Sequence, residues 1–354
     1  MIDQTEKERK GTESVDIDPS QGHPAGGSRR PARAWTPSRI LSVHGLLILL
    51  VLLSAGFSIA MPDTFPTTSN IRTLLATNAV IAFTALAVML PLAADEFDLS
   101  VGYVLGLAYV LTIGFQVRSG IPWEAAIVLA LLAGIVIGIV NGILVTTAQI
   151  SSFIASLAVG TFVSGISLWY TGGLQISGVL NPEFAEVSSW TIFSVIPAPA
   201  IYVAVVAVVI WIFLEFRPVG RSLLAVGANK RAAQLLGIRV NRYVFTAFVA
   251  SGFLASVGGV ILASQLQSAQ SSTGPDYLLP AFVGALLGAT SVRPGRVNVV
   301  GTLLAVLLLG VGLAGLQQAG AESYVQPLFN GGTLAVAVGV AGYAARRRLR
   351  RTTA

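Results

Sequence analysis

The chain alternates between long apolar stretches and short groups of charged residues from residue 40 onward. The first three uncharged stretches cover 40–62, 73–94 and 99–117, and each approaches or exceeds the roughly 20 helical residues that cross a bilayer core. The next stretch, 125–182, is too long for one helix, and we expect the polar sequence TTAQISS at 146–152 to divide it. Five more apolar stretches follow, at 187–214, 243–275, 277–292, 297–321 and 323–345.

This pattern predicts an all-α polytopic membrane protein with about ten transmembrane helices. Short apolar runs also occur as buried helices in soluble proteins, but ten of them in series would leave no helix surface to face water. Composition agrees, because only 11% of the residues are charged, against roughly 25% in soluble domains. The weakest span is 277–292, which is short and contains Pro280, and we expect a broken or partly re-entrant helix there.

Basic residues predict the orientation, because Lys and Arg are retained on the cytoplasmic side of a membrane. With the N-terminus inside the cell, only Arg72 and Arg118 of the 22 basic residues lie outside the cytoplasmic segments. An even number of spans returns the C-terminus to the same side. The net charge of +6 therefore reflects membrane orientation, and we expect no nucleic-acid partner. The basic cytoplasmic segments are 1–39, 217–242, 291–296 and 346–354.

The same pattern divides the chain into three parts. Residues 1–38 are rich in Ser, Gly, Pro, Asp and Lys, so we expect a disordered cytoplasmic tail, and their charged stretch is too long for a signal peptide. Residues 39–345 form the predicted transmembrane domain, and 346–354 form a basic cytoplasmic tail. The chain has no cysteine and only two histidines, so we expect neither a metal centre nor a cofactor.

The cytoplasmic segment 217–242 has capping, small and apolar residues at helical spacing, which a simple linker does not need. Within it we expect a short amphipathic helix that is capped by Asn229 and ended by Gly237. Such a helix either docks on a cytoplasmic partner or lies on the lipid headgroups, and spacing alone leaves both interpretations open. Its predicted apolar knob consists of Leu235, Leu236 and Ile238.

The sequence VGRSLLAVGANKRAAQLLGI in this segment resembles the cytoplasmic loop of a known family. These are the permease subunits of ATP-binding-cassette importers, in the branch that takes up ribose, xylose, galactose and similar monosaccharides. The loop of that branch typically follows the pattern G-R-x-x-x-A-x-G-x-N-x-x-A-A-x-x-x-G-I. The matching residues here are Gly220, Arg221, Ala225, Gly227, Asn229, Ala232, Ala233, Gly237 and Ile238.

The resemblance extends over roughly residues 70–345, because further segments match the family in the same order. They are DLSVG at 98–102, VNGILV at 140–145, FIASLAVGTFVSG at 153–165, GALLGATS at 284–291 and GTLLAVLLLGVGLAGL at 301–316. The chain departs from the family pattern in places. Glu96 and Phe97 precede Asp98 where Gly and Ile are usual, and Ser151 and Ser152 stand where Pro is usual.

The resemblance implies a type II importer-like permease in the cell membrane of a bacterium. It implies two permease chains, two cytoplasmic ATP-binding subunits and an extracellular or periplasmic sugar-binding protein. The chain itself has no G-x-x-x-x-G-K-[ST] phosphate loop, so a partner must hydrolyse the ATP, and we expect a transport subunit rather than an enzyme. The residues implied in coupling to the ATPase are Gly220, Arg221, Gly227, Asn229, Ala232, Ala233, Gly237 and Ile238.

Polar residues next to or inside the predicted spans are candidates for the translocation pathway. Asp98 lies in the densest acidic group at a membrane boundary, where it either caps the third helix or acts as an ion relay, and we favour the cap. Asn141 lies within an apolar run, where it either bonds a neighbouring helix or faces the pathway and bonds sugar hydroxyls. The full candidate set is Asp98, Ser100, Asn141, Phe153 and Thr161.

Glycines recur every fourth residue around Asn141, at Gly134, Gly138 and Gly142. A stripe of small residues lets two membrane helices approach closely, so we expect this face to pack against another helix. Sugar transport needs neutral hydrogen-bonding groups rather than fixed charges, and the scarcity of charge within the spans agrees with that.

Three other functions fit the sequence less well than import of a monosaccharide. A permease of the same broad family for branched-chain amino acids or nucleosides fits the helix count, but the 217–242 loop is nearer the sugar branch. An ion-coupled secondary transporter is expected to need an ion-coordinating residue deep in a span, and only the region 95–98 and Pro280 offer candidates. A membrane enzyme would need clustered nucleophiles, metal ligands or paired carboxylates, and the sequence shows none.

Overall fold

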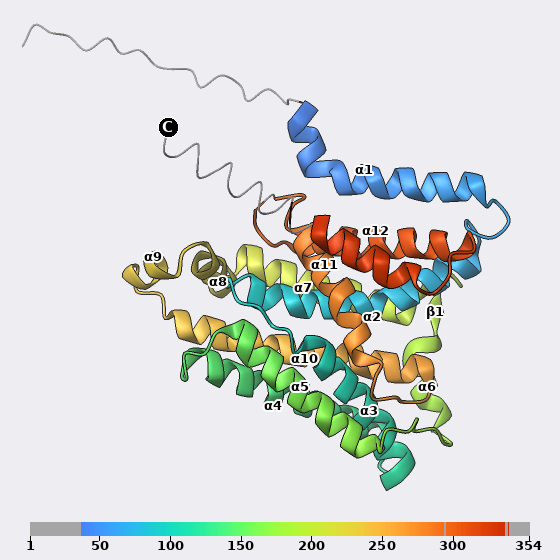
Figure 1. Cartoon of the computed structure of the whole chain (residues 1–354), viewed down its shortest axis with the longest axis horizontal. Coiled ribbons are helices and arrows are strands. Elements are labelled where there is room, and N and C mark those ends of the chain that lie inside the picture. The colour runs from blue at the N-terminus through green and yellow to red at the C-terminus, as the bar shows by residue number, and fades with distance from the viewer. Residues whose placement is uncertain (1–36, 294, 337–338, 340–354) are drawn as a thin grey trace, which may run out of the picture. The chain divides into compact units, whose positions relative to one another are not determined.

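The structure is a computed structural model and describes residues 37–293, 295–336 and 339. The N-terminal tail up to residue 36 and the basic tail 346–354 lie outside the described residues. The described part is almost entirely helical, and Figure 1 shows long helices packed side by side. The long helices are α1 (Pro37–Ala60), α2 (Thr68–Leu92), α3 (Val101–Ser119), α4 (Trp123–Thr146), α5 (Ser152–Thr171), α7 (Ala198–Phe216), α10 (Val240–Leu266) and α12 (Val299–Gln318).

Seven helices in the described residues are long and apolar enough to cross a membrane: α2, α3, α4, α5, α7, α10 and α12. The apolar part of α1, His44–Ala60, is shorter. Residues 325–336 are also helical, so each of the ten predicted spans contains a helix. The chain is therefore an all-α polytopic membrane protein.

Two of the uncharged stretches are longer than the helices that they contain. Within 187–214, α7 begins only at Ala198, because the connection between α5 and α7 extends to that residue. Before it lie the short helix α6 (Pro182–Ser189) and a two-stranded hairpin of β1 (Thr191–Ile192) and β2 (Ile196–Pro197). The stretch 243–275 is also interrupted, because α10 ends at Leu266 and Ala269 then pairs with Ile176 in an isolated β-bridge.

The predicted weak span at 277–292 contains the short helix α11 (Leu278–Gly288). Its 11 residues extend about 16 Å, roughly half the thickness of a bilayer core. Pro280 does not break it, because it lies in the first turn, where no intrahelical N–H bond is lost. The 3₁₀ helix η1 (Gly274–Tyr277) precedes α11, and its Gly274 packs closely on Gly102 and Gly106 of α3.

Helix α10 lies at the centre of the bundle and packs against α2, α3 and α4. Its contact with α4 uses the predicted glycine stripe. A Cβ at Gly134 would lie 2.5 Å from the Gly252 carbonyl oxygen, and one at Gly138 would lie 2.6 Å from the Phe248 carbonyl oxygen. These distances leave no room for a side chain, so the glycines are what allow the two backbones to touch. The predicted packing face is confirmed.

Candidate functional site

The segment 217–242, which the sequence predicts to be cytoplasmic, contains two short helices, α8 (Pro218–Ala228) and α9 (Lys230–Leu235). The predicted cap of α9 is confirmed, because the Asn229 side chain accepts a hydrogen bond from the Ala232 N–H at 2.9 Å. Gly237 follows the helix with φ +79°, a conformation that favours glycine, and the Ile238 N–H donates to the Ala233 carbonyl. Helix α8 was not predicted, although Pro218 in its first turn is a usual helix-start signal.

The eight residues that the resemblance implies in coupling separate into two groups. Arg221, Asn229, Ala232 and Gly237 are exposed, whereas Gly220 and Ala233 are buried and Gly227 and Ile238 are half-buried. A Cβ at Gly220 would lie 2.1 Å from the Phe213 carbonyl oxygen, so the absence of a side chain here lets α8 pack closely against the end of α7. The buried residues therefore pack against the rest of the chain and fix the conformation of the segment. The exposed residues are the ones accessible to a partner.

Two leucines form the outermost part of α9 and its C-terminal turn. Leu235 is 86% exposed and Leu236 is 78% exposed, while Ile238 packs against the core. Adjacent exposed apolar side chains of this kind can contact either a partner protein or the membrane surface. The apolar knob predicted from the sequence thus consists of Leu235 and Leu236, without Ile238.

This segment also contacts the connection between α2 and α3, a relationship that the sequence pattern does not indicate. Lys230 Nζ lies 2.7 Å from Glu96 Oε1 and 3.3 Å from the Asp95 carbonyl oxygen. At Gly227 a Cβ would lie 2.2 Å from the Ala93 carbonyl oxygen, so α8 rests directly on this connection. We call residues 93–100 the α2–α3 connection.

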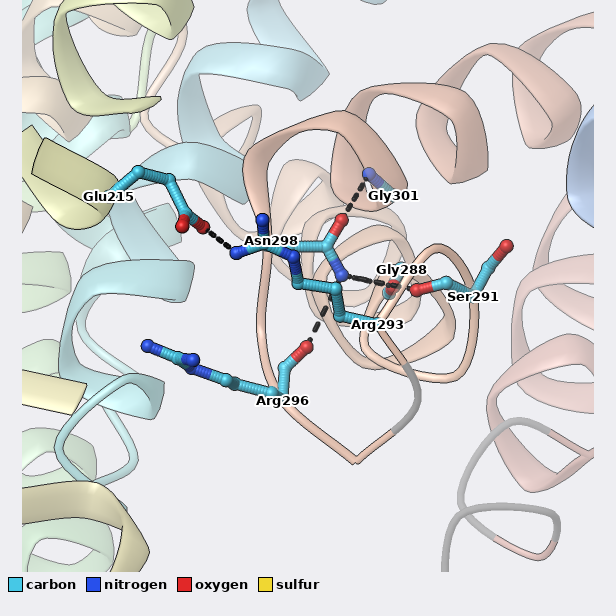
Figure 2. A network of polar contacts seen from close by, with 7 residues as sticks. All are labelled: Glu215, Gly288, Ser291, Arg293, Arg296, Asn298 and Gly301. Atoms are coloured by element: carbon cyan, nitrogen blue, oxygen red, sulfur yellow. Dashed lines mark hydrogen bonds and ion pairs between the residues drawn. The ribbon is translucent and has the colours of Figure 1, made fainter. Parts of the chain in front are cut away.

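A second ion pair joins the C-terminal end of α7, directly before α8, to the segment between α11 and α12. Figure 2 shows the Arg293 guanidinium facing the Glu215 carboxylate, with which it forms an ion pair. The hydrogen bond to Glu215 raises the pKa of Arg293 above its ordinary value. Asn298 organises the same turn. Its Nδ2 donates to the carbonyls of Gly288 and Ser291 at 3.1 Å each, and its Oδ1 caps α12 by accepting from the Gly301 N–H at 2.7 Å.

Three of the five pathway candidates meet in a buried polar cluster, defined by Asp98, Ser100, Asn141 and Ser251. Asp98 Oδ1 accepts from the Ser100 hydroxyl at 2.6 Å, and Oδ2 accepts from the Ser251 hydroxyl of α10 at 2.8 Å. Asn141 of α4 donates from Nδ2 to Ser100 Oγ at 2.8 Å. None of the four side chains is more than 1% exposed. The cluster therefore joins the α2–α3 connection to α4 and α10.

Helix α5 holds the same connection through its first turns. The Ser152 hydroxyl accepts from the Phe97 N–H at 3.1 Å, and the Ser156 hydroxyl accepts from the Leu99 N–H at 2.9 Å. An extended connection inside a bundle has backbone groups that helix formation cannot satisfy, and these serines bond two of them. Ser152, which departs from the family pattern, thus has a structural role.

The outcome for the individual candidates differs. The expected cap by Asp98 is wrong in its residue, because the N-cap of α3 is Ser100, and Asp98 instead accepts the Ser100 N–H at 3.0 Å. Asn141 donates a hydrogen bond to Ser100, the N-cap of α3, which agrees with the expectation that it bonds a neighbouring helix. Phe153 and Thr161 do not join the cluster, since both are exposed on α5. Ser251 was missed, because no local pattern distinguishes it from the other serines of α10.

Among the described residues no group of three or more His, Asp or Glu side chains is placed to hold a metal ion. The described residues form a bundle that includes seven helices long and apolar enough to span a membrane, with Leu235 and Leu236 exposed at the C-terminal end of α9. The family model described as "Branched-chain amino acid transport system / permease component" matches residues 70–338, and the chain belongs to this family.

Relatives of known name support this membership. The ribose import permease protein RbsC of Bacillus subtilis (strain 168) is 35% identical over 83% of this chain and 89% of that protein. RbsC of Escherichia coli (strain K12) is 31% identical over 88% of this chain and 96% of that protein. The D-allose transport system permease protein AlsC of the same strain is 27% identical over 83% and 90%. No solved structure is significantly similar to the chain.

Proposed function

We propose that the chain is the membrane-spanning permease subunit of an ATP-binding-cassette importer that moves a monosaccharide into the bacterial cytoplasm. Family membership and the named ribose and allose permeases support this function. The same relatives and the apolar helices place the chain in the inner membrane as a multi-pass protein. ATP hydrolysis comes from a partner, since the chain has no phosphate loop of its own.

The exposed pair Leu235–Leu236 carries the coupling part of the proposal. In this proposal α9 and its C-terminal turn dock on the cytoplasmic ATP-binding subunit, and the flanking arginines lie beside it. Lys230 and Gly227 then pass movements of the docked helix to the α2–α3 connection. That connection ends in the buried polar cluster, so a shift of α9 reaches α4 and α10 through hydrogen-bonded side chains.

The assembly proposed here has two copies of this chain, two ATP-binding subunits and one external sugar-binding protein. Each copy has ten membrane helices, of which α11 crosses the bilayer only together with the residues that flank it, and both termini lie in the cytoplasm. The basic residues of 217–242 and 291–296 then lie on the inner side, where Arg293 binds Glu215 and Lys230 binds Glu96.

The description of the family model favours a second candidate, a branched-chain amino acid. Uptake measurements separate the two. Cells of the source bacterium that lack this chain should lose uptake of one sugar from a panel of radiolabelled D-ribose, D-allose, D-xylose and D-galactose. L-Leucine uptake should stay unchanged. Loss of L-leucine uptake with every sugar unaffected would reject the monosaccharide assignment.

The docking assignment needs a variant that changes only the surface. Replacing Leu235 and Leu236 together by Ser should abolish sugar-stimulated ATP hydrolysis, while the amount of the chain in the membrane stays normal. Val179→Ser is the matched control, because Val179 is 99% exposed outside the docking segment. Ala233 is unsuitable for such a test, because it is 2% exposed and a larger side chain there would disturb the fold.

A further inference from the structure

The hairpin of β1 and β2 exposes apolar side chains directly before α7. Phe193 at its tip is 88% exposed, and Ile192 and Ile196, which pair across the two strands, are 40% and 41% exposed. No charged residue occurs between Glu186 and Glu215, so this surface has no fixed charge of its own. An uncharged apolar tip is unfavourable in water, which indicates that the hairpin has a less polar neighbour.

The backbone at the tip makes Phe193 an unusual residue for its position. Phe193 and Ser194 have φ of +52° and +58°, and the Val195 N–H donates to the Ile192 carbonyl oxygen at 3.2 Å, which closes a tight turn. Turns with two positive φ values favour Asn and Gly, because larger side chains crowd the backbone there. A bulky residue held in this conformation with its ring exposed gains little within the chain, and such strain indicates a contact outside it.

The start of the hairpin is fixed to one side of α7. Trp190 Nε1 donates to the Tyr202 hydroxyl at 3.1 Å, and this hydroxyl donates to the Val187 carbonyl oxygen at 3.0 Å. The rings of Trp190 and Tyr202 also meet edge to face, with their centroids 6.0 Å apart. Val205 and Val209 follow Tyr202 at helical spacing on the same face of α7, and they are 58% and 61% exposed. The hairpin therefore begins beside the exposed face of this helix.

That exposed face identifies the neighbour of the hairpin as lipid. Helix α7 is long and apolar enough to cross a membrane, where side chains that point away from the bundle contact acyl chains. Its 19 residues extend about 28 Å, so the hairpin and α8 lie near opposite surfaces of the bilayer core. Figure 1 shows β1 and α6 at one end of the bundle and α8 and α9 at the other. Trp and Tyr are enriched at these surfaces, which fits the aromatic pair that holds the hairpin.

We propose that the hairpin 190–197 is a lipid anchor, which inserts Phe193 among the acyl chains of the adjacent leaflet and places Trp190 at the level of the headgroups. In the proposed orientation this is the outer leaflet. Lipid is the occupant that fits, because the apolar surface continues the exposed face of α7 and offers no charged side chain to a soluble partner. The inference goes beyond the proposed function and does not depend on which solute is transported.

The anchor acts on α6, which directly precedes the hairpin. The hydroxyls of Ser188 and Ser264 lie 2.8 Å apart, and the Ser264 hydroxyl donates to the Phe184 carbonyl oxygen at 2.8 Å. The Phe184 side chain is fully buried. Helix α6 is thus held by α10 on one side and followed by the hairpin on the other, so the anchor sets the level of this connection relative to the membrane surface.

The absence of cysteine from the chain allows a single nitroxide spin label at a chosen residue. Ser194→Cys places the label at the tip beside an intact Phe193. Val205→Cys on the exposed face of α7 is the lipid reference, and Glu186→Cys is the water reference, because Glu186 is an exposed charged residue of α6. The full chain is reconstituted in vesicles of phosphatidylethanolamine and phosphatidylglycerol. Power-saturation EPR then compares collisions of each label with oxygen, which concentrates in lipid, and with a water-soluble nickel chelate.

The label at residue 194 should favour oxygen over nickel as the label at residue 205 does, and unlike the label at residue 186. Phe193→Asn in the Ser194→Cys background should raise nickel collisions toward those at residue 186. Loss of one inserted aromatic side chain lowers the ratio of inserted to detached hairpin roughly tenfold or more. Asn suits a positive φ, so the turn itself should persist. Phe193→Leu is the matched control, which keeps an apolar side chain and should leave the label in lipid.

Three results would overturn the proposal. The first is a label at residue 194 that meets the nickel chelate as often as the label at residue 186. The second is a label shielded from both oxygen and nickel, which would indicate that protein, such as a second copy of the chain, covers the hairpin. The third is nickel contact in the assembled importer that disappears when the external sugar-binding protein is added, which would assign the hairpin to that partner.

Discussion

Lys230, the first residue of α9, forms an ion pair with Glu96 of the α2–α3 connection, with 2.7 Å between Nζ and Oε1. The two residues are 134 positions apart in the chain. Two residues beyond Glu96 lies Asp98, the centre of the buried polar cluster. The pair therefore joins α9 to the connection whose Asp98 and Ser100 are hydrogen-bonded to α10 and α4.

The first prediction concerns this pair. Lys230→Glu and Glu96→Lys should each reduce sugar uptake and sugar-stimulated ATP hydrolysis, because each places like charges against one another. Combining the two substitutions should restore most of both activities. The expected interaction energy is about 0.5–1 kcal/mol, since the Lys230 side chain is 39% exposed and solvent weakens the attraction.

A double-mutant cycle on uptake rates measures this energy. If Lys230 acted directly on the ATP-binding subunit, the charge-swapped double variant would stay as impaired as Lys230→Glu alone. That result would remove the ion pair from the coupling route.

The second prediction concerns the contact of α8 with the α2–α3 connection. Gly227→Ala should lower the stability of the permease by roughly 1–3 kcal/mol, because the new Cβ would meet the Ala93 carbonyl oxygen. Gly165→Ala in α5 is the matched control, since none of the described residues lies within 4 Å of a Cβ there. The control should be neutral or stabilising by up to about 1 kcal/mol. Thermal unfolding in detergent compares the two, and equal midpoints would show that the close contact is absent.

The third prediction concerns the buried polar cluster. Ser251→Ala removes the hydroxyl that donates to Asp98 Oδ2 and should cost about 1–3 kcal/mol of unfolding free energy. Thr161→Val is the control, because Thr161 is exposed and its hydroxyl donates to the Leu157 carbonyl of its own helix. Its effect should stay within about 0.5 kcal/mol. Denaturant unfolding measures both, and a neutral Ser251→Ala would mean that Asp98 does not depend on α10.

Much of the fold follows from local pattern. A helix occurs in every predicted apolar stretch because an uncharged run in a bilayer must satisfy its backbone bonds internally. The cap by Asn229 and the end at Gly237 were predictable for a similar reason, since both depend on residues within one turn.

What the pattern could not predict depends on contacts between distant residues. Ser251 binds Asp98 across 153 positions, and nothing in its own neighbourhood marks it as a partner. Nothing in the sequence around Lys230 likewise indicates that it forms an ion pair with Glu96. The sequence also does not show that Ala233 is buried. Ala232 and Ala233 are adjacent alanines of the same motif, and only the packing of α9 makes one exposed and the other buried.

The fourth prediction tests the central claim that the Leu235–Leu236 surface binds a cytoplasmic ATP-binding subunit. Leu236→Cys gives a single thiol in a chain without natural cysteine, at a position 78% exposed. In vesicles of the assembled importer, a short cross-linker with a maleimide at one end and a photoreactive group at the other should join this residue to the ATP-binding subunit on illumination. In intact cells, a membrane-impermeant maleimide should leave it unlabelled. Labelling from outside the intact cell, with no cross-link to the ATP-binding subunit, would contradict both the orientation and the docking surface.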